Sequence, residues 1–387
     1  MSTPLHTLVW FYFFVYMVNA VYGTFAPVYF EHIGFSNTQI GLLLSVGPLV
    51  AVLAQPFWGT VGDRAQTKNS VLMMLLGGSA ICMLVFPLSG HFIFVLVLIC
   101  LYMFFQTPVF AVGDAITLEV LDRRGSGNFS LIRMGGTFGF AIMSVVFGFI
   151  ANEQVGLLFP VNAAVFCICL LLVLRFPRVE GHQSHGVKMH MGMLFRYRKL
   201  MLYMAASFLF HVTLGYYYSF FPLYFQELGA TNAWVGWSML VSSLSEIPFL
   251  LLSAYLFKRV RISYILLGAG IATAVRWYVY SIIENPWWMF PAQALHGVIF
   301  IVLTVTMAIV INREVPGELK ASGQTLHALL CLGVARMIGS FFGGITSDAI
   351  GMRETFFYNS LLAGAGVIVF GAIFWIKERK EGTRAAA

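Results

Sequence analysis

The sequence contains twelve runs of about twenty or more mainly apolar residues, separated by short polar segments. A helix needs about 20 apolar residues to cross a bilayer. The runs cover residues 7–30, 39–61, 70–89, 92–119, 131–151, 155–175, 200–226, 233–257, 263–283, 287–312, 321–348 and 355–376. They lack the alternation of polar and apolar residues that a membrane β-barrel requires. The sequence therefore predicts an all-α membrane protein with twelve transmembrane helices.

The composition excludes the main soluble classes. Only 10% of the 387 residues are charged and 59% are hydrophobic, whereas a soluble domain has about 25% charged residues. Such a chain is also too apolar to be disordered. Its five cysteines form no CxxC pair, so we interpret them as buried thiols. The first run lacks a basic leader and a small-residue cleavage site, so we expect a membrane helix and not a cleaved signal peptide.

The basic residues lie mostly in alternate loops. Of the 23 Lys and Arg residues, nineteen fall in one set of loops and the C-terminal tail, and the opposite loops hold one, Arg353. Cytoplasmic loops of membrane proteins carry the excess of Lys and Arg. We therefore expect a multi-pass protein of the cytoplasmic membrane with both termini in the cytoplasm. The net charge of +7 is then a topology signal and does not indicate nucleic-acid binding.

The two halves of the chain repeat one another. Phe25–Phe30 recurs as Phe220–Phe225, an offset of 195 residues. At the same offset, Gly34, Asn37 and Gly41 match Gly229, Asn232 and Gly236. The offset spans six runs, an even number, so both halves have the same orientation, as in transporters built from parallel repeats.

We predict three segments from this repeat. Residues 1–180 form an N-terminal six-helix bundle, and residues 199–387 form a C-terminal six-helix bundle with a short cytoplasmic tail. Residues 181–198 form a cytoplasmic interdomain loop. This loop contains His182, His185 and His190, which we interpret as part of a solvated linker and not as a metal site.

Several charged residues lie inside the predicted helices, where a charge costs at least about 2.5–3.5 kcal/mol. They are Asp114, Glu119, Arg133, Glu246, Arg276, Arg336 and Asp348. Asp114 and Arg133 have similar depth on the fourth and fifth runs, which predicts that they approach within salt-bridge distance in at least one conformational state. Glu246, Arg276 and His296 lie near the middle of the eighth, ninth and tenth runs, which predicts a second cluster. A purely structural ion pair in each half is the alternative. Glu119 and Asp348 lie near run ends, and Arg336 has no predicted partner.

Helical spacing gathers further polar residues on shared faces. Three such groups are Tyr12, Tyr16 and Asn19; His211, Gly215 and Tyr218; and Gln324 and His327. Each group alone is also compatible with an interhelical hydrogen bond. The substrate-binding residues that we predict are Asn19, Tyr22, Asp114, Arg133, His211, Tyr218, Gln293 and Gln324.

Motifs of ATP hydrolysis and of hydrolytic catalysis are missing from the sequence. It contains no Walker A motif, no His-Glu-x-x-His and no Gly-x-Ser-x-Gly. We therefore expect no enzyme activity, no cofactor and no metal. An ion gradient or the solute gradient itself must supply the energy.

The segment Gly59–Lys68, between the second and third runs, resembles the signature loop of the major facilitator superfamily. It departs from that pattern at Ala65, Gln66 and Asn69, where Gly or basic residues are usual. The resemblance covers the whole chain and implies two six-helix bundles. It also implies that Gly59, Asp63 and Arg64 belong to a loop that takes part in the conformational change.

A narrower resemblance rests on Gly113–Ala115, Ile132–Phe140, Ser245–Pro248, Val275–Trp277 and Gln293–Gly297. These segments look like those of the phenylpropionate permease group, which is similar to the lactose permease and to nucleoside–proton symporters.

The resemblance implies roles for five charged or titratable residues. Asp114 and Arg133 would hold the substrate, and Glu246, Arg276 and His296 would link it to a proton. One departure is that the tenth run has no carboxylate between Glu284 and Glu314. Proton transfer would then fall to Glu246 or Asp114, and we favour Glu246.

These observations together predict a proton-coupled importer of a small organic solute that works by alternating access. An aromatic carboxylate, a glycoside or sugar, and a nucleoside are the candidate substrates. We expect a monomer in the lipid bilayer whose partners are its substrate and protons. The alternatives are a proton-driven exporter of the same superfamily and, from another class, a membrane receptor that does not transport.

Overall fold

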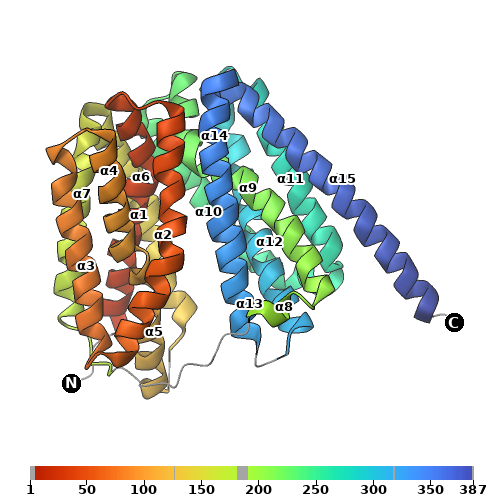
Figure 1. Ribbon diagram of the computed structural model, residues 1–387, viewed down its shortest axis with the longest axis horizontal. Helices are drawn as coiled ribbons and strands as arrows, with labels where there is room; N and C mark the ends of the chain where they lie inside the picture. The colour runs from red at the N-terminus through yellow and green to blue at the C-terminus, as the bar shows by residue number, and fades with distance from the viewer. Residues whose placement is uncertain (1–4, 126, 181–190, 317–318, 386–387) are drawn as a thin grey trace. The chain divides into compact units, whose positions relative to one another are not determined.

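The structure is a computed structural model that describes residues 5–125, 127–180, 191–316 and 319–385. The regular structure of these residues is entirely helical (Figure 1). The α-helices are α1 (Leu5–His32), α2 (Asn37–Arg64), α3 (Lys68–Val85), α4 (Phe92–Gln106), α5 (Pro108–Arg124), α6 (Phe129–Gln154), α7 (Leu158–Val173), α8 (Met191–Leu194), α9 (Arg198–Glu227), α10 (Asn232–Arg259), α11 (Ile262–Ile282), α12 (Met289–Glu314), α13 (Lys320–His327), α14 (Arg336–Ile350) and α15 (Met352–Ala385). Short 3-10 helices cover Phe86–Leu88, Val155–Leu157 and Pro286–Trp288, and a π-helix covers Ala328–Ala335.

Among the described residues, eleven helical stretches are long and apolar enough to cross a membrane. One of them, Phe129–Val173, has 45 residues and consists of α6, a 3-10 turn and α7. Both α6 and α7 pack against α1, so this stretch supplies two of the predicted membrane helices. Pro108 is the first residue of α5 and divides the fourth run into α4 and α5, because proline cannot continue the hydrogen bonding of α4.

The helices group into two compact units. Unit 1 contains residues 1–187 and 221–240, and unit 2 contains residues 188–220 and 241–387. Residues 221–240 group with unit 1 because the start of α10 is bonded to the end of α6. Asn232 Nδ2 donates to the Ala151 carbonyl at 2.9 Å, and the Ala233 N–H donates to Asn152 Oδ1 at 3.1 Å. The domain boundaries expected from the repeat at 181–198 stay a prediction.

Glycines let α6 approach α1 closely in unit 1. A Cβ atom on Gly139 would collide with the Phe13 carbonyl, and one on Gly136 would collide with the Tyr16 ring. Small residues at such positions allow membrane helices to pack backbone against backbone. The close approach places the α1 tyrosines beside Arg133, near the start of α6.

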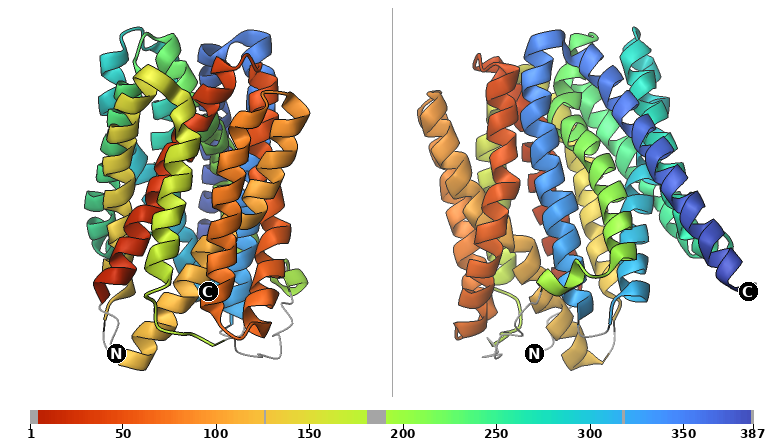
Figure 2. Two further views of the ribbon diagram at one scale, coloured as in Figure 1. Left: turned by 90° about the vertical axis from the view of Figure 1, so that its left-hand side faces the viewer. Right: turned by 45° about the vertical axis from the view of Figure 1, so that its right-hand side comes forward.

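Unit 2 uses the same device between α9 and α14. A Cβ atom on Gly339 would collide with the Val212 carbonyl, and one on Gly215 would collide with the Arg336 backbone. Toward its C-terminal end, α15 diverges from α14 (Figures 1 and 2) and packs along α11.

Candidate functional site

In unit 1, two tyrosines of α1 bind the two predicted substrate-binding charges. The Tyr12 hydroxyl donates to Asp114 Oδ1 at 2.5 Å, and Arg133 Nε donates to the Tyr16 hydroxyl at 3.1 Å. Tyr12 is buried, Asp114 is half-buried and Arg133 is exposed. Asp114 and Arg133 are both described, and the ion pairs of this structure do not include one between them. In this structure the two tyrosines, one helical turn apart, each bind one of the two charges, and the predicted approach of Asp114 and Arg133 in at least one state stays a prediction.

Asn19 lies farther along the same face of α1. Its Oδ1 accepts a hydrogen bond from Gln106 Nε2, at the end of α4, at 3.2 Å. Gln106 was not among the predicted site residues, although a glutamine just before Thr107 and Pro108 in an apolar run was a usable signal. Tyr22 is buried against Tyr102, with ring centroids 4.8 Å apart, and within the described residues its hydroxyl has no hydrogen-bond partner.

The predicted conformational loop lies at the end of α2. Gly59 has open space around its Cα, and Arg64 is exposed. The side chain of Asp63 lies outside the described residues, as do His182, His185 and His190.

Lys68, the last residue of the segment Gly59–Lys68, joins it to the end of α5. Lys68 Nζ lies 3.3 Å from Glu119 Oε2, and Arg123 Nη2 lies 2.6 Å from Glu119 Oε1. Glu119, which the sequence placed near the end of its run, thus has Lys68 and Arg123 among its partners. Asn69, where the chain departs from the superfamily pattern, donates to the Pro177 carbonyl and accepts from the Val179 N–H, both at 3.0 Å.

Arg276 is the central charge of unit 2, and its side chain is 0% exposed. Its Nε and Nη2 donate to the Tyr280 hydroxyl at 3.3 and 3.1 Å, and Nη2 also donates to Gln293 Oε1. Its guanidinium lies 4.3 Å from the centroid of the Tyr217 ring. Within the described chain, no carboxylate lies within ion-pair distance of Arg276, so neutral acceptors and aromatic faces hold this charge.

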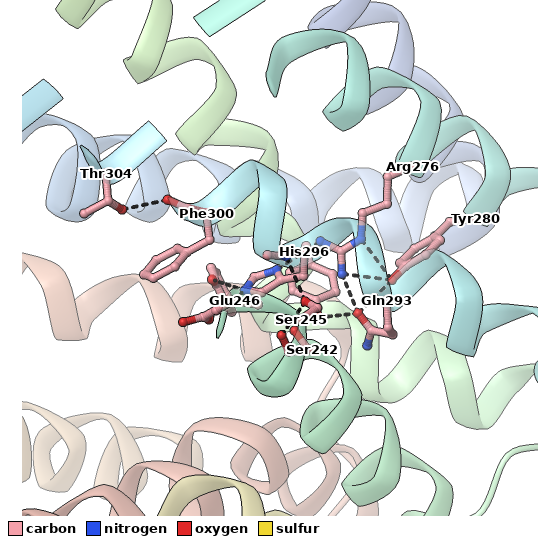
Figure 3. A network of polar contacts seen from close by, with 12 residues as sticks. Ser242, Ser245, Glu246, Arg276, Tyr280, Gln293, His296, Phe300 and Thr304 are labelled. Atoms are coloured by element: carbon pink, nitrogen blue, oxygen red, sulfur yellow. Dashed lines mark hydrogen bonds and ion pairs between the residues drawn. The ribbon is translucent and has the colours of Figure 1, made fainter. Parts of the chain in front are cut away.

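His296 lies between Arg276 and Glu246 (Figure 3). Arg276 Nη1 is 3.1 Å from His296 Nδ1, and His296 Nε2 is 3.7 Å from Glu246 Oε1. A guanidinium can only donate, so Nδ1 accepts and the ring proton of a neutral His296 lies on Nε2. That proton faces Glu246 and the Tyr218 hydroxyl, which is 3.3 Å from Nε2. The predicted cluster is thus a chain of contacts in which His296 separates the acid from the arginine.

Gln293 and Gly297 fix this arrangement on α12. Gln293 Oε1 accepts from the Tyr217 hydroxyl at 2.9 Å and from the Tyr280 hydroxyl at 3.1 Å, in addition to Arg276. A Cβ atom on Gly297 would collide with the Ser245 carbonyl, and the Gly297 N–H donates to Ser245 Oγ at 2.9 Å. This close approach of α10 and α12 brings Glu246 beside His296.

A second polar group in unit 2 contains His211, His327 and Arg336. His211 Nδ1 is 2.8 Å from the Ser207 carbonyl, so it carries the proton and leaves Nε2 as an acceptor. The two imidazole centroids are 6.0 Å apart, and the Arg336 guanidinium lies 4.5 Å from the centroid of the Tyr218 ring. In the part of the chain described, His211 Nε2, His327 Nε2 and Arg336 Nε are buried without hydrogen-bond partners.

The π-helix explains why the sequence analysis found no partner for Arg336. In an α-helix with 3.6 residues per turn, His327 and Arg336 lie on opposite faces. The π-helix Ala328–Ala335 separates them, and its i→i+5 bonding puts more residues into each turn. Arg336 is therefore rotated toward the side of His327. Gln324 and His327, which were expected to share a helical face, differ in exposure, since Gln324 is exposed and His327 is buried.

Comparisons with known proteins place this geometry in a family. Residues 5–358 match the MFS_1 like family. The maltose permease of Geobacillus stearothermophilus is 25% identical over 365 residues, which are 93% of this chain and 92% of the permease. The putative nucleoside transporter YegT of Escherichia coli is 26% identical over 364 residues, 88% of this chain and 84% of YegT. The multidrug resistance protein MdtG of Citrobacter koseri is 24% identical over 380 residues, 92% and 91% of the two chains.

Solved structures agree on the fold. The crystal structure of a mutant of the nucleoside transporter NupG superposes with a TM-score of 0.88 at 17% sequence identity. The match covers 96% of this chain and 99% of NupG. The predicted fold class is therefore confirmed. The chain belongs to the MFS_1 like family of major facilitator transporters, and it is a multi-pass integral membrane transporter and not an enzyme.

Proposed function

We propose that this protein is a proton-coupled importer of a small organic solute and that it works by alternating access. The observation that carries the proposal is the chain of contacts Glu246–His296–Arg276 inside unit 2. A buried guanidinium without a carboxylate partner is costly in a membrane protein. A buried charge is also a poor source of stability. The position of Arg276 beside His296, with Glu246 next in the chain of contacts, is therefore better explained by a role in proton coupling.

Glu246 is the group that exchanges the proton in this proposal. It is a carboxylic acid whose side chain is 28% exposed, so water can reach it from one side while His296 faces it from the other. The ionised form attracts the Nε2 proton of His296, and the neutral form attracts it less. A proton on Glu246 therefore weakens the contact between α10 and α12. If substrate binds better to the protonated protein, the proton also binds better when substrate is present, because linkage between two ligands is reciprocal. The two are then carried together.

The substrate-binding residues that we propose lie in both units. In unit 1 they are Asn19, Tyr22, Asp114 and Arg133, and in unit 2 they are His211, Tyr218 and Gln293. Asp114 and Arg133 each have a hydroxyl partner, and both retain donor or acceptor capacity for a ligand. Gln324 is exposed and is the least supported of the predicted set.

The relatives support a small organic substrate, since they include a maltose permease and a putative nucleoside transporter. A glycoside or sugar, a nucleoside and an aromatic carboxylate are the proposed classes. We also propose that the protein is a monomer in the plasma membrane with both termini in the cytoplasm, as the loop charges indicate.

A proton-driven exporter is the second candidate, because the relatives also include a multidrug resistance protein. Proteoliposomes with an imposed pH gradient separate the two functions. We expect uptake of one class in a panel of labelled sugars, nucleosides and aromatic acids when the side from which substrate enters is acidic. Movement of the substrate against the direction of proton flow would identify an exporter, and movement of no solute under either gradient would contradict both candidates.

A further inference from the structure

A cavity of about 410 Å³ lies at the end of unit 2 where α9 and α11 begin and α12 ends. Four basic side chains line it: Lys199 on α9, Arg261 directly before α11, Arg313 on α12 and Lys377 on α15. Glu314 is the one acidic residue among the described lining residues, and its Oε1 lies 2.9 Å from Lys199 Nζ. Basic side chains therefore outnumber acidic ones in the described lining, which favours an anionic ligand.

Backbone groups add to this preference. The first residues of α11, Ile262 and Ser263, line the cavity. Arg261, at the N-cap position, makes no side-chain capping hydrogen bond. The first N–H groups of a helix have no partner within the helix, and its N-terminus has a partial positive charge. This helix end, inside a basic cavity, suits the oxygens of a phosphate group.

The rest of the lining is apolar or aromatic. Leu202, Val310 and Phe374 contribute to it, and Phe374 stacks on Tyr203 with ring centroids 4.9 Å apart. The Tyr203 hydroxyl lies 2.8 Å from Ser263 Oγ. The cavity lining thus combines apolar with charged side chains, as expected for a ligand that has a phosphate and a hydrocarbon part.

The helices α15 and α11, which contribute Phe374 and Ser263 to the cavity, also carry exposed apolar residues. Ile368 is 74% exposed, Trp375 is 59% exposed and Tyr264 is 51% exposed. In a membrane protein such residues face lipid, and Trp and Tyr settle at the headgroup level. A molecule with its phosphate in the cavity would therefore lay its hydrocarbon chains on this surface.

We infer that this cavity binds the headgroup of an anionic phospholipid, with the phosphate held by Arg261, Arg313 and the N-terminus of α11. Basic pockets between membrane helices are suited to such headgroups. The inference does not depend on the proposed substrate or on proton coupling.

The test uses the full-length protein in detergent and native mass spectrometry with phosphatidylglycerol and phosphatidylcholine of the same acyl chains. Arg261→Gln/Arg313→Gln removes two charges from the cavity. Lys258→Gln/Arg259→Gln is the matched control, because these residues are exposed at the end of α10 and do not line the cavity. At about 1 kcal/mol for each basic residue, we expect phosphatidylglycerol to bind the cavity variant about 30-fold more weakly. Binding to the control should stay within about threefold of the wild type.

Three outcomes would overturn the inference. The first is equal binding of the two lipids by the wild type. The second is an equal loss of phosphatidylglycerol binding in the cavity variant and the control. The third is displacement of phosphatidylglycerol by millimolar inorganic phosphate, which would show a site for free anions. Equal thermal stability of both variants in phosphatidylcholine would show that the cavity variant is folded.

Discussion

The substitution Glu246→Gln tests the proposed proton coupling most directly. Glutamine keeps the size of the side chain, and its Oε1 can still accept from His296 Nε2, but it cannot exchange a proton. Because the Glu246 side chain is partly exposed and lies 3.7 Å from His296, we expect stability to change by less than about 1 kcal/mol. Any loss of transport would then be a loss of coupling and not of folding.

The size of the effect follows from the driving force. A gradient of one pH unit stores about 1.4 kcal/mol per proton, so a one-to-one symporter can accumulate its substrate about tenfold. In proteoliposomes we expect the wild type to approach this ratio and Glu246→Gln to equilibrate near a ratio of about one. Exchange of labelled for unlabelled substrate does not require net proton movement, so the variant should retain it.

Glu246→Asp serves as the matched control because it keeps a titratable carboxyl group at the same position on α10. We expect it to accumulate substrate above equilibrium, although more slowly than the wild type. If Glu246→Gln accumulates substrate as the wild type does, Glu246 is not the coupling residue and Asp114 becomes the candidate. If both variants lose exchange as well as accumulation, Glu246 acts in substrate binding.

Three further predictions concern other parts of the molecule. Asp114→Asn and Arg133→Gln should each lower substrate affinity at least about tenfold. Stability should change little, because the asparagine still accepts from Tyr12 and the glutamine can still donate to Tyr16. Normal transport by both variants would exclude the pair from the site. Gln293→Leu removes the oxygen that accepts hydrogen bonds from Tyr217, Arg276 and Tyr280. It should lower the free energy of unfolding by about 3 kcal/mol or more, measured as a lower unfolding temperature. Gln293→Glu keeps an acceptor oxygen and should not lower it. A single cysteine in place of Lys188 should react with a membrane-impermeant reagent added on the cytoplasmic side, and one in place of Arg353 should react from the outside. Labelling of position 188 from outside would contradict the topology.

The amino-acid sequence alone determined the membrane helices and the residues that needed an explanation. Whether a segment can cross a bilayer depends on its own length and hydropathy, so the apolar runs could be read without knowledge of the fold. A charge inside such a run is costly wherever its partner lies, and this drew attention to Asp114, Glu246 and Arg276. The repeat and the loop charges are likewise local patterns, and they predicted the order and orientation of the helices.

Only the tertiary structure decided which side chains meet. The sequence predicted that Asp114 and Arg133 meet in at least one state, and in this structure α1 places Tyr12 beside Asp114 on α5 and Tyr16 beside Arg133 on α6. It also predicted a cluster of Glu246, Arg276 and His296, and the contact of α10 with α12 at Gly297 places His296 between the other two. Partners on different helices depend on helix rotation and on shifts of a few ångströms. A π-helix such as Ala328–Ala335 changes that rotation in a way that a period of 3.6 residues does not reveal.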